Sequence, residues 1–111
     1  MCGIAGYSAQ SENLPSKQTM RDIQDSLLNR GPDGYGDYFY KSYGLVHTRL
    51  SIIDLHNGTQ PIKDNFGNVL IANGEVYNDL EVRKKFNKFK FSTGSDSESI
   101  LALYKVYGLD F

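Results

Sequence analysis

The 111-residue sequence has a single cysteine, no excess of either charge and no long apolar run, and each of these absences excludes a class of protein. One cysteine cannot form an internal disulfide, so we expect a cytoplasmic protein rather than a disulfide-bonded secreted domain. Twelve basic and thirteen acidic residues leave a net charge of −1, which predicts no nucleic-acid partner. No apolar run is long enough to span a bilayer and no secretory signal precedes it, so we expect no membrane partner.

The remaining composition indicates one small globular domain, because 40% of the residues are apolar and 23% are charged. The periodicity of the apolar residues predicts strands at 2–7, 35–40, 44–53 and 69–72, and helices at 16–29, 79–86 and 95–108. The strands follow one another in hairpin-like order and helices lie at both flanks. This pattern predicts an α+β fold with an antiparallel sheet.

Turn and cap residues delimit several of these elements. Asn73-Gly74 is typical of a tight hairpin turn, here between 69–72 and a short extended segment at 76–77. Ser95 and Glu98 form the capping-box pattern at the start of the last helix, and Gly108 is placed to end that helix. The last helix is followed at once by the end of the sequence with no closing strand, so we expect the chain to be part of a larger domain.

The single cysteine is residue 2, directly behind Met1. Met1 is readily removed when the next side chain is small, and the chain would then begin with a residue that carries both a thiol and a free α-amine. The amine can take the proton of the thiol, directly or through a water, and the thiolate is the reactive form. On position alone, a small apolar residue in a first strand remains the simpler interpretation of Cys2.

Five short motifs change that balance when they are taken together. They lie in order at residues 1–4, 30–33, 47–54, 73–78 and 95–98, and read MCGI, RGPD, HTRLSIID, NGEVYN and SDSE. In this order and at this spacing they closely resemble the glutaminase domain of glutamine-hydrolysing asparagine synthetases, which are class II glutamine amidotransferases among the N-terminal-nucleophile hydrolases. The resemblance covers essentially the whole chain. It implies an enzyme that hydrolyses L-glutamine to glutamate and ammonia through a thioester on Cys2.

The resemblance assigns the catalytic groups to three residues. Cys2 is the nucleophile and its own α-amine is the base. The side-chain amide of Asn73 and the backbone N–H of Gly74 form an oxyanion hole for the developing negative oxygen. Without the resemblance, Asn73-Gly74 would be interpreted as a turn, although a turn can also present a backbone N–H.

The resemblance also assigns the groups that bind the two charged ends of glutamine. Arg49 holds the α-carboxylate, which suits its planar guanidinium, while Asp96 and, secondarily, Glu75 face the α-ammonium. Backbone contacts come from Leu50, Ser51, Ile52 and Ile53. Taken alone, Arg49 is interpreted more simply as a surface residue at a strand end, and Asp96 as an acid that favours a helix N-terminus.

Two further groups of residues do not indicate a site. His47 and His56 with Asp54 invite a metal-site hypothesis, but their spacing points them in different directions, and a histidine in a buried strand is typically hydrogen-bonded core. We therefore expect no metal. The motif at 30–33 is expected to be structural, since it ends a helix and orders a loop near the site. No phosphate-binding glycine loop is present.

The fold that the resemblance implies is larger than this chain. A complete domain is a sandwich of two antiparallel sheets between helices, and residues 1–111 correspond to its N-terminal part, with the second half missing. The glutaminase step needs no cofactor, whereas ATP and Mg would serve only a synthetase domain that the chain lacks. The implied partners are L-glutamine and either a synthetase domain or the missing half-domain on another chain. The alternatives are an inactive or partner-complementing fragment and a glutaminase that serves a different ammonia acceptor.

Overall fold

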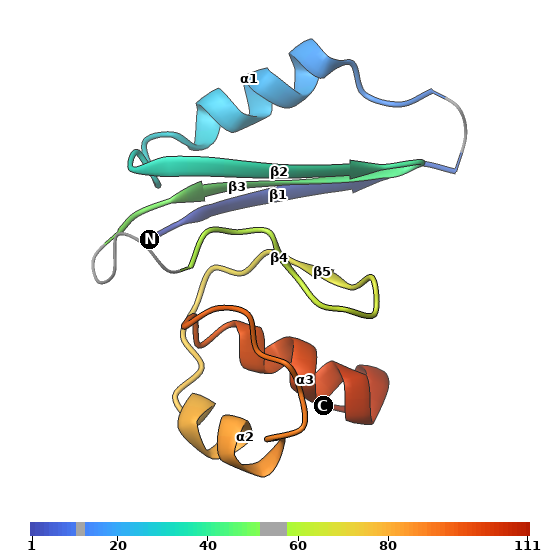
Figure 1. Cartoon of the computed structure of the whole chain (residues 1–111). Coiled ribbons are helices and arrows are strands. Elements are labelled where there is room, and N and C mark those ends of the chain that lie inside the picture. The colour runs from blue at the N-terminus through green and yellow to red at the C-terminus, as the bar shows by residue number, and fades with distance from the viewer. Residues whose placement is uncertain (11–12, 52–57) are drawn as a thin grey trace.

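The computed structural model describes residues 1–10, 13–51 and 58–111 (Figure 1). Three helices, five strands and a short terminal 3-10 turn are assigned within these residues. In chain order they are β1 (Gly3–Ser8), α1 (Lys17–Leu27), β2 (Gly34–Tyr40), β3 (Tyr43–Arg49), β4 (Ile62–Lys63), β5 (Val69–Leu70), α2 (Asp79–Lys85), α3 (Glu98–Tyr107) and η1 (Gly108–Asp110). The predicted α+β class with antiparallel sheets is confirmed.

The larger sheet has the strand order β1-β3-β2, with both neighbours antiparallel to β3. Helix α1 covers one face of this sheet (Figure 1). The Thr48 hydroxyl of β3 donates to the Leu27 carbonyl of α1 at 3.0 Å, and Met20 of the helix is buried. The side chain of Ser16 accepts from the Thr19 N–H and caps the helix. The sheet and its helix therefore form one packed layer pair.

The alternation of side chains along β3 decides which residues face away from α1. Thr48 points toward the helix, so its neighbours His47 and Arg49 point to the other face of the sheet. Ile4 of β1 lies opposite His47 in the register, and Cys2 stands two residues before Ile4, on the same side. The sheet thus presents Cys2 and Arg49 toward the second part of the molecule.

That second part consists of β4, β5 and the two C-terminal helices. The β4–β5 hairpin lies between the three-stranded sheet and the helices α2 and α3 (Figure 1). Its turn is closed by the Asp64 carboxylate, which accepts from the N–H groups of Phe66 and Asn68. Ile62, Val82, Leu101 and Ala102 are the buried apolar residues of this part. The small number of such residues makes its core thin.

The predicted strand at 44–53 ends earlier than expected, at Arg49. Leu50 and Ser51 are not in a strand, and 52–53 lie outside the described residues. The predicted hairpin turn at Asn73-Gly74 is wrong, because β5 ends at Leu70 and no strand follows Gly74 before α2. The Ala72 N–H donates instead to the Gln60 side chain at 2.6 Å, so a side chain takes the place of a strand partner.

The predicted capping box is also wrong. Helix α3 begins at Glu98 with Ser97 as the preceding residue, and Ser97 makes no side-chain cap bond. The Glu98 carboxylate is turned away from Ser95 and accepts from Ser92 and Thr93. A buried carboxylate requires several donors, and the loop before the helix provides more of them than one cap position could. Gly108, with φ of 61°, ends the helix as predicted.

The motif at 30–33 has the predicted structural role. A Cβ on Gly31 would lie 2.4 Å from the carbonyl carbon of Thr48, so only glycine allows this approach of the two backbones. The Asp33 N–H donates to the Arg49 carbonyl at 2.9 Å, and the Asp33 carboxylate accepts from the Ser51 N–H at 2.7 Å. These bonds fix the end of β3.

Among the helices of the described part, none is both long and apolar enough to cross a membrane.

Candidate active site

A cavity of about 670 Å³ opens where the end of β3 meets the loops before α2 and α3. Its lining comes from segments far apart in the sequence, namely residues 1–2, 49–50, 58, 60, 72–75, 77 and 94–97. Seven of the residues predicted to form the site are among them: Cys2, Arg49, Leu50, Asn73, Gly74, Glu75 and Asp96. The volume is in the range of pockets for small molecules.

Cys2 contributes a free, half-buried thiol to one wall of the cavity. The Leu50 N–H donates to the Cys2 sulfur at 3.5 Å, which ties the thiol to the residue that follows β3. Met1 also lines the cavity and is 70% exposed. Removal of Met1 would therefore place the α-amine of Cys2 inside the same cavity as its thiol.

Asn73 and Gly74 lie on an exposed segment that is fixed just before them. The N–H of Ala72 donates to the Gln60 side chain at 2.6 Å. No atom lies within 4 Å of the point where a Cβ on Gly74 would stand, so the backbone is open to a ligand there. The segment is thus held at one residue and open at the next two.

His47 is 1% exposed, and its burial lowers the pKa of the ring below the usual value. The backbone of Ala72 opposes this change in the pKa, while the positive charge of Arg49 adds to it. His47 is thus a core residue, as predicted, but its buried Nε2 has no hydrogen-bond partner within the described part of the chain.

No cluster of three potential metal ligands occurs among residues 1–10, 13–51 and 58–111. The other two members of the metal hypothesis, Asp54 and His56, lie outside the described residues. The lining itself provides one thiol, one guanidinium and two carboxylates.

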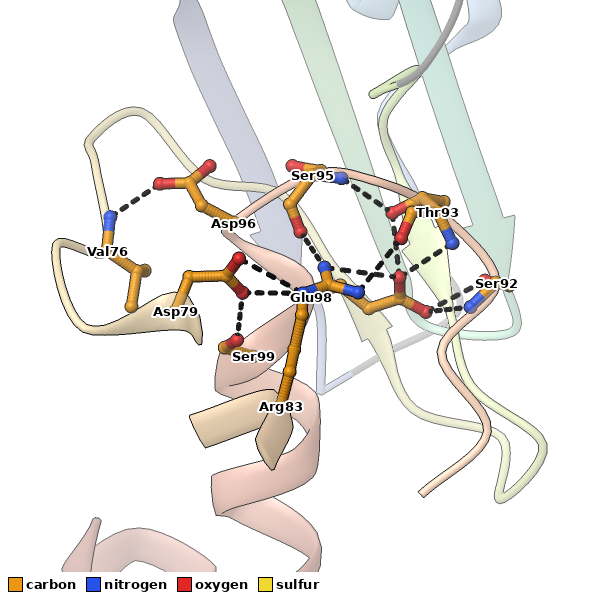
Figure 2. A network of polar contacts seen from close by, with 9 residues as sticks. All are labelled: Val76, Asp79, Arg83, Ser92, Thr93, Ser95, Asp96, Glu98 and Ser99. Carbon is orange, nitrogen blue, oxygen red and sulfur yellow. Dashed lines mark hydrogen bonds and ion pairs between the residues drawn. The ribbon is translucent and has the colours of Figure 1, made fainter. Parts of the chain in front are cut away.

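The charged groups of the lining have both signs. The Arg49 side chain reaches Gly58, where its Nη2 would lie 3.6 Å from an added Cβ. Asp96 is half-buried, and its Oδ2 accepts from the Val76 N–H at 2.5 Å (Figure 2). Glu75 is exposed on the same segment as Val76. A cavity with a cation and carboxylates can bind a zwitterion by both of its ends.

Of the three other predicted backbone contributors, the structure describes only Ser51. The Ser51 N–H is occupied by the Asp33 carboxylate, and Ser51 does not line the cavity. Ile52 and Ile53 lie outside the described residues. Conversely, Gln60 and Tyr77 line the cavity and were not predicted. The sequence gives no local signal for Gln60, because its partner Ala72 is twelve residues away.

Comparison with known proteins identifies the family to which this chain belongs. Residues 1–111 match the family described as glutamine amidotransferase domain, and the chain belongs to that family. The resemblance predicted from the five motifs is confirmed. Within the family, several similar proteins carry the name asparagine synthetase.

Asparagine synthetase [glutamine-hydrolyzing] 1 of Arabidopsis thaliana is 39% identical over 113 residues, covering 100% of this chain and 19% of that protein. Asparagine synthetase B [glutamine-hydrolyzing] of Escherichia coli is 36% identical over 114 residues, covering 100% of this chain and 21% of that protein. A relative of another name, amidase chry2 of Gibberella zeae, is 38% identical over 126 residues, covering 100% of this chain and 19% of that protein. The chain spans about a fifth of the length of these relatives.

Proposed function

We propose that the chain provides the glutaminase half-reaction of an asparagine-synthetase type amidotransferase, converting L-glutamine and water to L-glutamate and ammonia. The observation that carries the proposal is that Cys2, Arg49, Asn73 and Asp96, from four separate segments, line one cavity. Membership of the glutamine amidotransferase family supports the same substrate.

In the proposed reaction, the α-amine of Cys2, freed by loss of Met1, takes the thiol proton. The sulfur attacks the side-chain amide carbon of glutamine, and the negative charge on the oxygen is stabilised by the Asn73 amide and the Gly74 N–H. The C–N bond breaks, and the leaving nitrogen takes the proton to become ammonia. Water then attacks the γ-glutamyl thioester with the amine again as base, which releases glutamate and restores the thiol.

The charged groups of the lining determine how glutamine is held. Arg49 binds the α-carboxylate with two N–H groups, while Asp96, assisted by Glu75, binds the α-ammonium. The backbone of Leu50, which lines the cavity, adds a contact to the substrate. A residue inside a peptide has neither free charge, so this arrangement selects a free amino acid over a protein substrate.

We further propose that residues 1–111 are the N-terminal part of an N-terminal-nucleophile hydrolase sandwich. The order α1, three-stranded sheet, β4–β5 hairpin and α2 with α3 supports a helix–sheet–sheet–helix arrangement (Figure 1). In this proposal the glutaminase step needs no cofactor. ATP and Mg belong to a synthetase domain that receives the ammonia and activates aspartate.

Two alternatives have a specific observation in their favour. The similarity to amidase chry2 favours a glutaminase that delivers ammonia to an acceptor other than aspartate. An apolar groove of about 350 Å³ beside β5, lined by residues that include Leu70, Ile100, Tyr104 and Phe111, favours a fragment that is completed by another chain. Either alternative leaves the proposed glutamine site unchanged.

The test is covalent labelling of Cys2 by a diazoketone analogue of glutamine, measured as the intact mass of the purified chain. We expect loss of Met1 and a single adduct, which excess L-glutamine suppresses and which is absent in Cys2→Ala. D-glutamine is the matched control, because it has the same groups in the wrong arrangement and should not protect. An adduct that L-glutamine fails to suppress, or the absence of any adduct on a folded chain, would contradict the proposal.

A further inference from the structure

The Asp96 loop is fixed from outside the cavity by one side chain of α2, that of Arg83 (Figure 2). The Arg83 Nε lies 2.8 Å and 3.0 Å from the two carboxylate oxygens of Asp79. Its Nη1 donates to the Thr93 carbonyl at 3.1 Å, and its Nη2 donates to the Ser95 carbonyl at 2.6 Å. The guanidinium also stacks 4.4 Å from the ring centre of Phe91. All three nitrogens are therefore used, two of them on the loop that leads to Asp96.

Glu98 holds the same loop from its other side. Its Oε1 accepts from the N–H and the hydroxyl of Ser92 at 2.7 Å and 2.8 Å. Its Oε2 accepts from the N–H and the hydroxyl of Thr93, both at 2.7 Å, and lies 4.0 Å from the Arg83 Nη2. Although burial raises the pKa of Glu98, the bonds from Ser92 and Thr93 outweigh burial and lower the pKa. The carboxylate thus remains ionised and fully hydrogen-bonded beside Arg83.

Asp96 follows this clamped loop directly and reaches into the cavity. Its Oδ2 accepts from the Val76 N–H at 2.5 Å, so the clamp also determines where the segment after Asn73-Gly74 lies. Asp79 continues the chain of contacts, because the Ser99 hydroxyl of α3 donates to the same carboxylate that binds Arg83 (Figure 2). Movement of Arg83 would therefore displace Asp96 and Val76 together.

We infer that Arg83 is a positioning residue that sets the Asp96 carboxylate for the α-ammonium of the substrate, and so determines the selectivity for a free amino acid. The inference rests on the proposed glutaminase function. Arg83 does not line the cavity, so it acts only through Asp96. A lysine in its place could keep the charge beside Asp79, but it has no planar fork to span Asp79, Thr93 and Ser95 at once.

The test compares Arg83→Lys with the wild-type chain, using two reagents for the Cys2 thiol. The diazoketone analogue of glutamine carries the α-ammonium, whereas iodoacetamide does not. We expect Arg83→Lys to lower the labelling rate with the analogue about tenfold, as for one misaligned hydrogen bond to a charged group. The rate with iodoacetamide should stay at the wild-type value. Lys84→Gln, at the exposed neighbouring position, should change neither rate.

A second measurement does not depend on the substrate. Hydrogen exchange of the Val76 amide reports the bond to Asp96, and we expect its protection to fall in Arg83→Lys and to persist in Lys84→Gln. If Arg83→Lys fails to fold, Glu98→Gln weakens the same clamp from its other side. Glu98→Gln should then lower the labelling rate with the analogue about threefold, with the same loss of Val76 protection.

Two results would overturn the inference. One is an equal fall of both labelling rates, which means that Arg83 only stabilises the fold. The other is unchanged Val76 protection in Arg83→Lys, which means that the Asp96 bond does not depend on the clamp. Failure of the proposed function is recognised separately, because the wild-type chain itself would then not react selectively with the analogue, and the Val76 measurement would still decide whether Arg83 positions Asp96.

Discussion

His47 of β3 is buried, and its environment includes the backbone of Ala72, which lines the cavity. Its burial makes the protonated ring unfavourable, so the pKa of His47 is lower in the folded chain than in the unfolded one. Between these two values the unfolded chain binds more protons. The stabilising contribution of neutral His47 to the free energy of unfolding is therefore complete above the usual histidine pKa of about 6.5. It is lost as the pH falls through that value toward the pKa of the folded chain.

We accordingly expect the free energy of unfolding to decrease as the pH is lowered from neutral through the histidine range. The measurement is urea unfolding at a series of pH values. His47→Gln should remove this part of the pH dependence, whereas His56→Gln, the control at the other histidine of the chain, should retain it. A pH profile that is the same in the wild-type chain and in His47→Gln would contradict the assignment.

At the scale of residues, the motif resemblance, rather than any residue type alone, predicted that Cys2, Arg49 and Asp96 lie close together, and all three line one cavity. Cys2, Arg49 and Asp96 are individually ordinary, and only their order along the chain with the other motifs indicated a common cavity. The resemblance did not predict the side chains that hold the segments of the cavity in place. Gln60 and Arg83 act through backbone groups of distant residues, and a backbone partner leaves no signature in the sequence.

At the scale of elements, the segment before β4 packs directly against β2. A Cβ on Gly36 would lie 1.9 Å from the carbonyl oxygen of Gln60, a distance at which the two backbones must separate. We expect Gly36→Ala to destabilise the chain by about 1–3 kcal/mol or more. Because Gln60 binds Ala72, we also expect faster hydrogen exchange at the Ala72 amide.

Gly34→Ala is the matched control for this prediction. Gly34 lies in the same strand, and no atom lies within 4 Å of the place where its Cβ would be. Its effect on the free energy of unfolding should stay within about 0.5 kcal/mol. Chemical denaturation of both variants provides the comparison, and equal losses at the two positions would show that the close approach at Gly36 has no energetic role.

The elements that could be predicted from the sequence are those defined by local signals. Helix α1 follows from the helical spacing of Met20, Ile23 and Leu27, and strands β1 and β2 are close to their predicted limits. Local signals were misleading where a distant partner competes. Ser95 and Glu98 have the pattern of a capping box, yet Glu98 is bound by Ser92 and Thr93. The short strand β4 was not predicted, since two residues carry no periodicity.

At the scale of the whole molecule, the cavity joins the two parts of the fold. Cys2 and Arg49 come from the three-stranded sheet side, while Asn73 and Asp96 come from the segments that lead into α2 and α3. A ligand that contacts both walls should stabilise the folded chain by linkage, by about 2.7 kcal/mol at a free concentration about 100 times its Kd. L-glutamine is the ligand that we propose.

We therefore expect L-glutamine to raise the thermal midpoint of Cys2→Ala, a variant that retains the binding groups but cannot turn over the substrate. The shift, measured by calorimetry, should increase with glutamine concentration and be lost when Asp96→Asn is added. Adding Asp37→Asn, at an exposed position of β2, is the matched control and should leave the shift intact. A shift that survives Asp96→Asn at full size would contradict the proposed role of Asp96.

The hydrogen bond between Leu50 and the Cys2 sulfur has a consequence for synthesis of the chain. The two residues are separated by 48 positions, so at about 5–20 residues per second the ribosome needs several seconds to supply the donor after it has supplied the thiol. The edge strand β1 must likewise wait for β3, which comes last of the three strands of its sheet. During that interval the Cys2 thiol lacks the hydrogen-bond donor, and β1 lacks the strand partner, that each has in the folded chain.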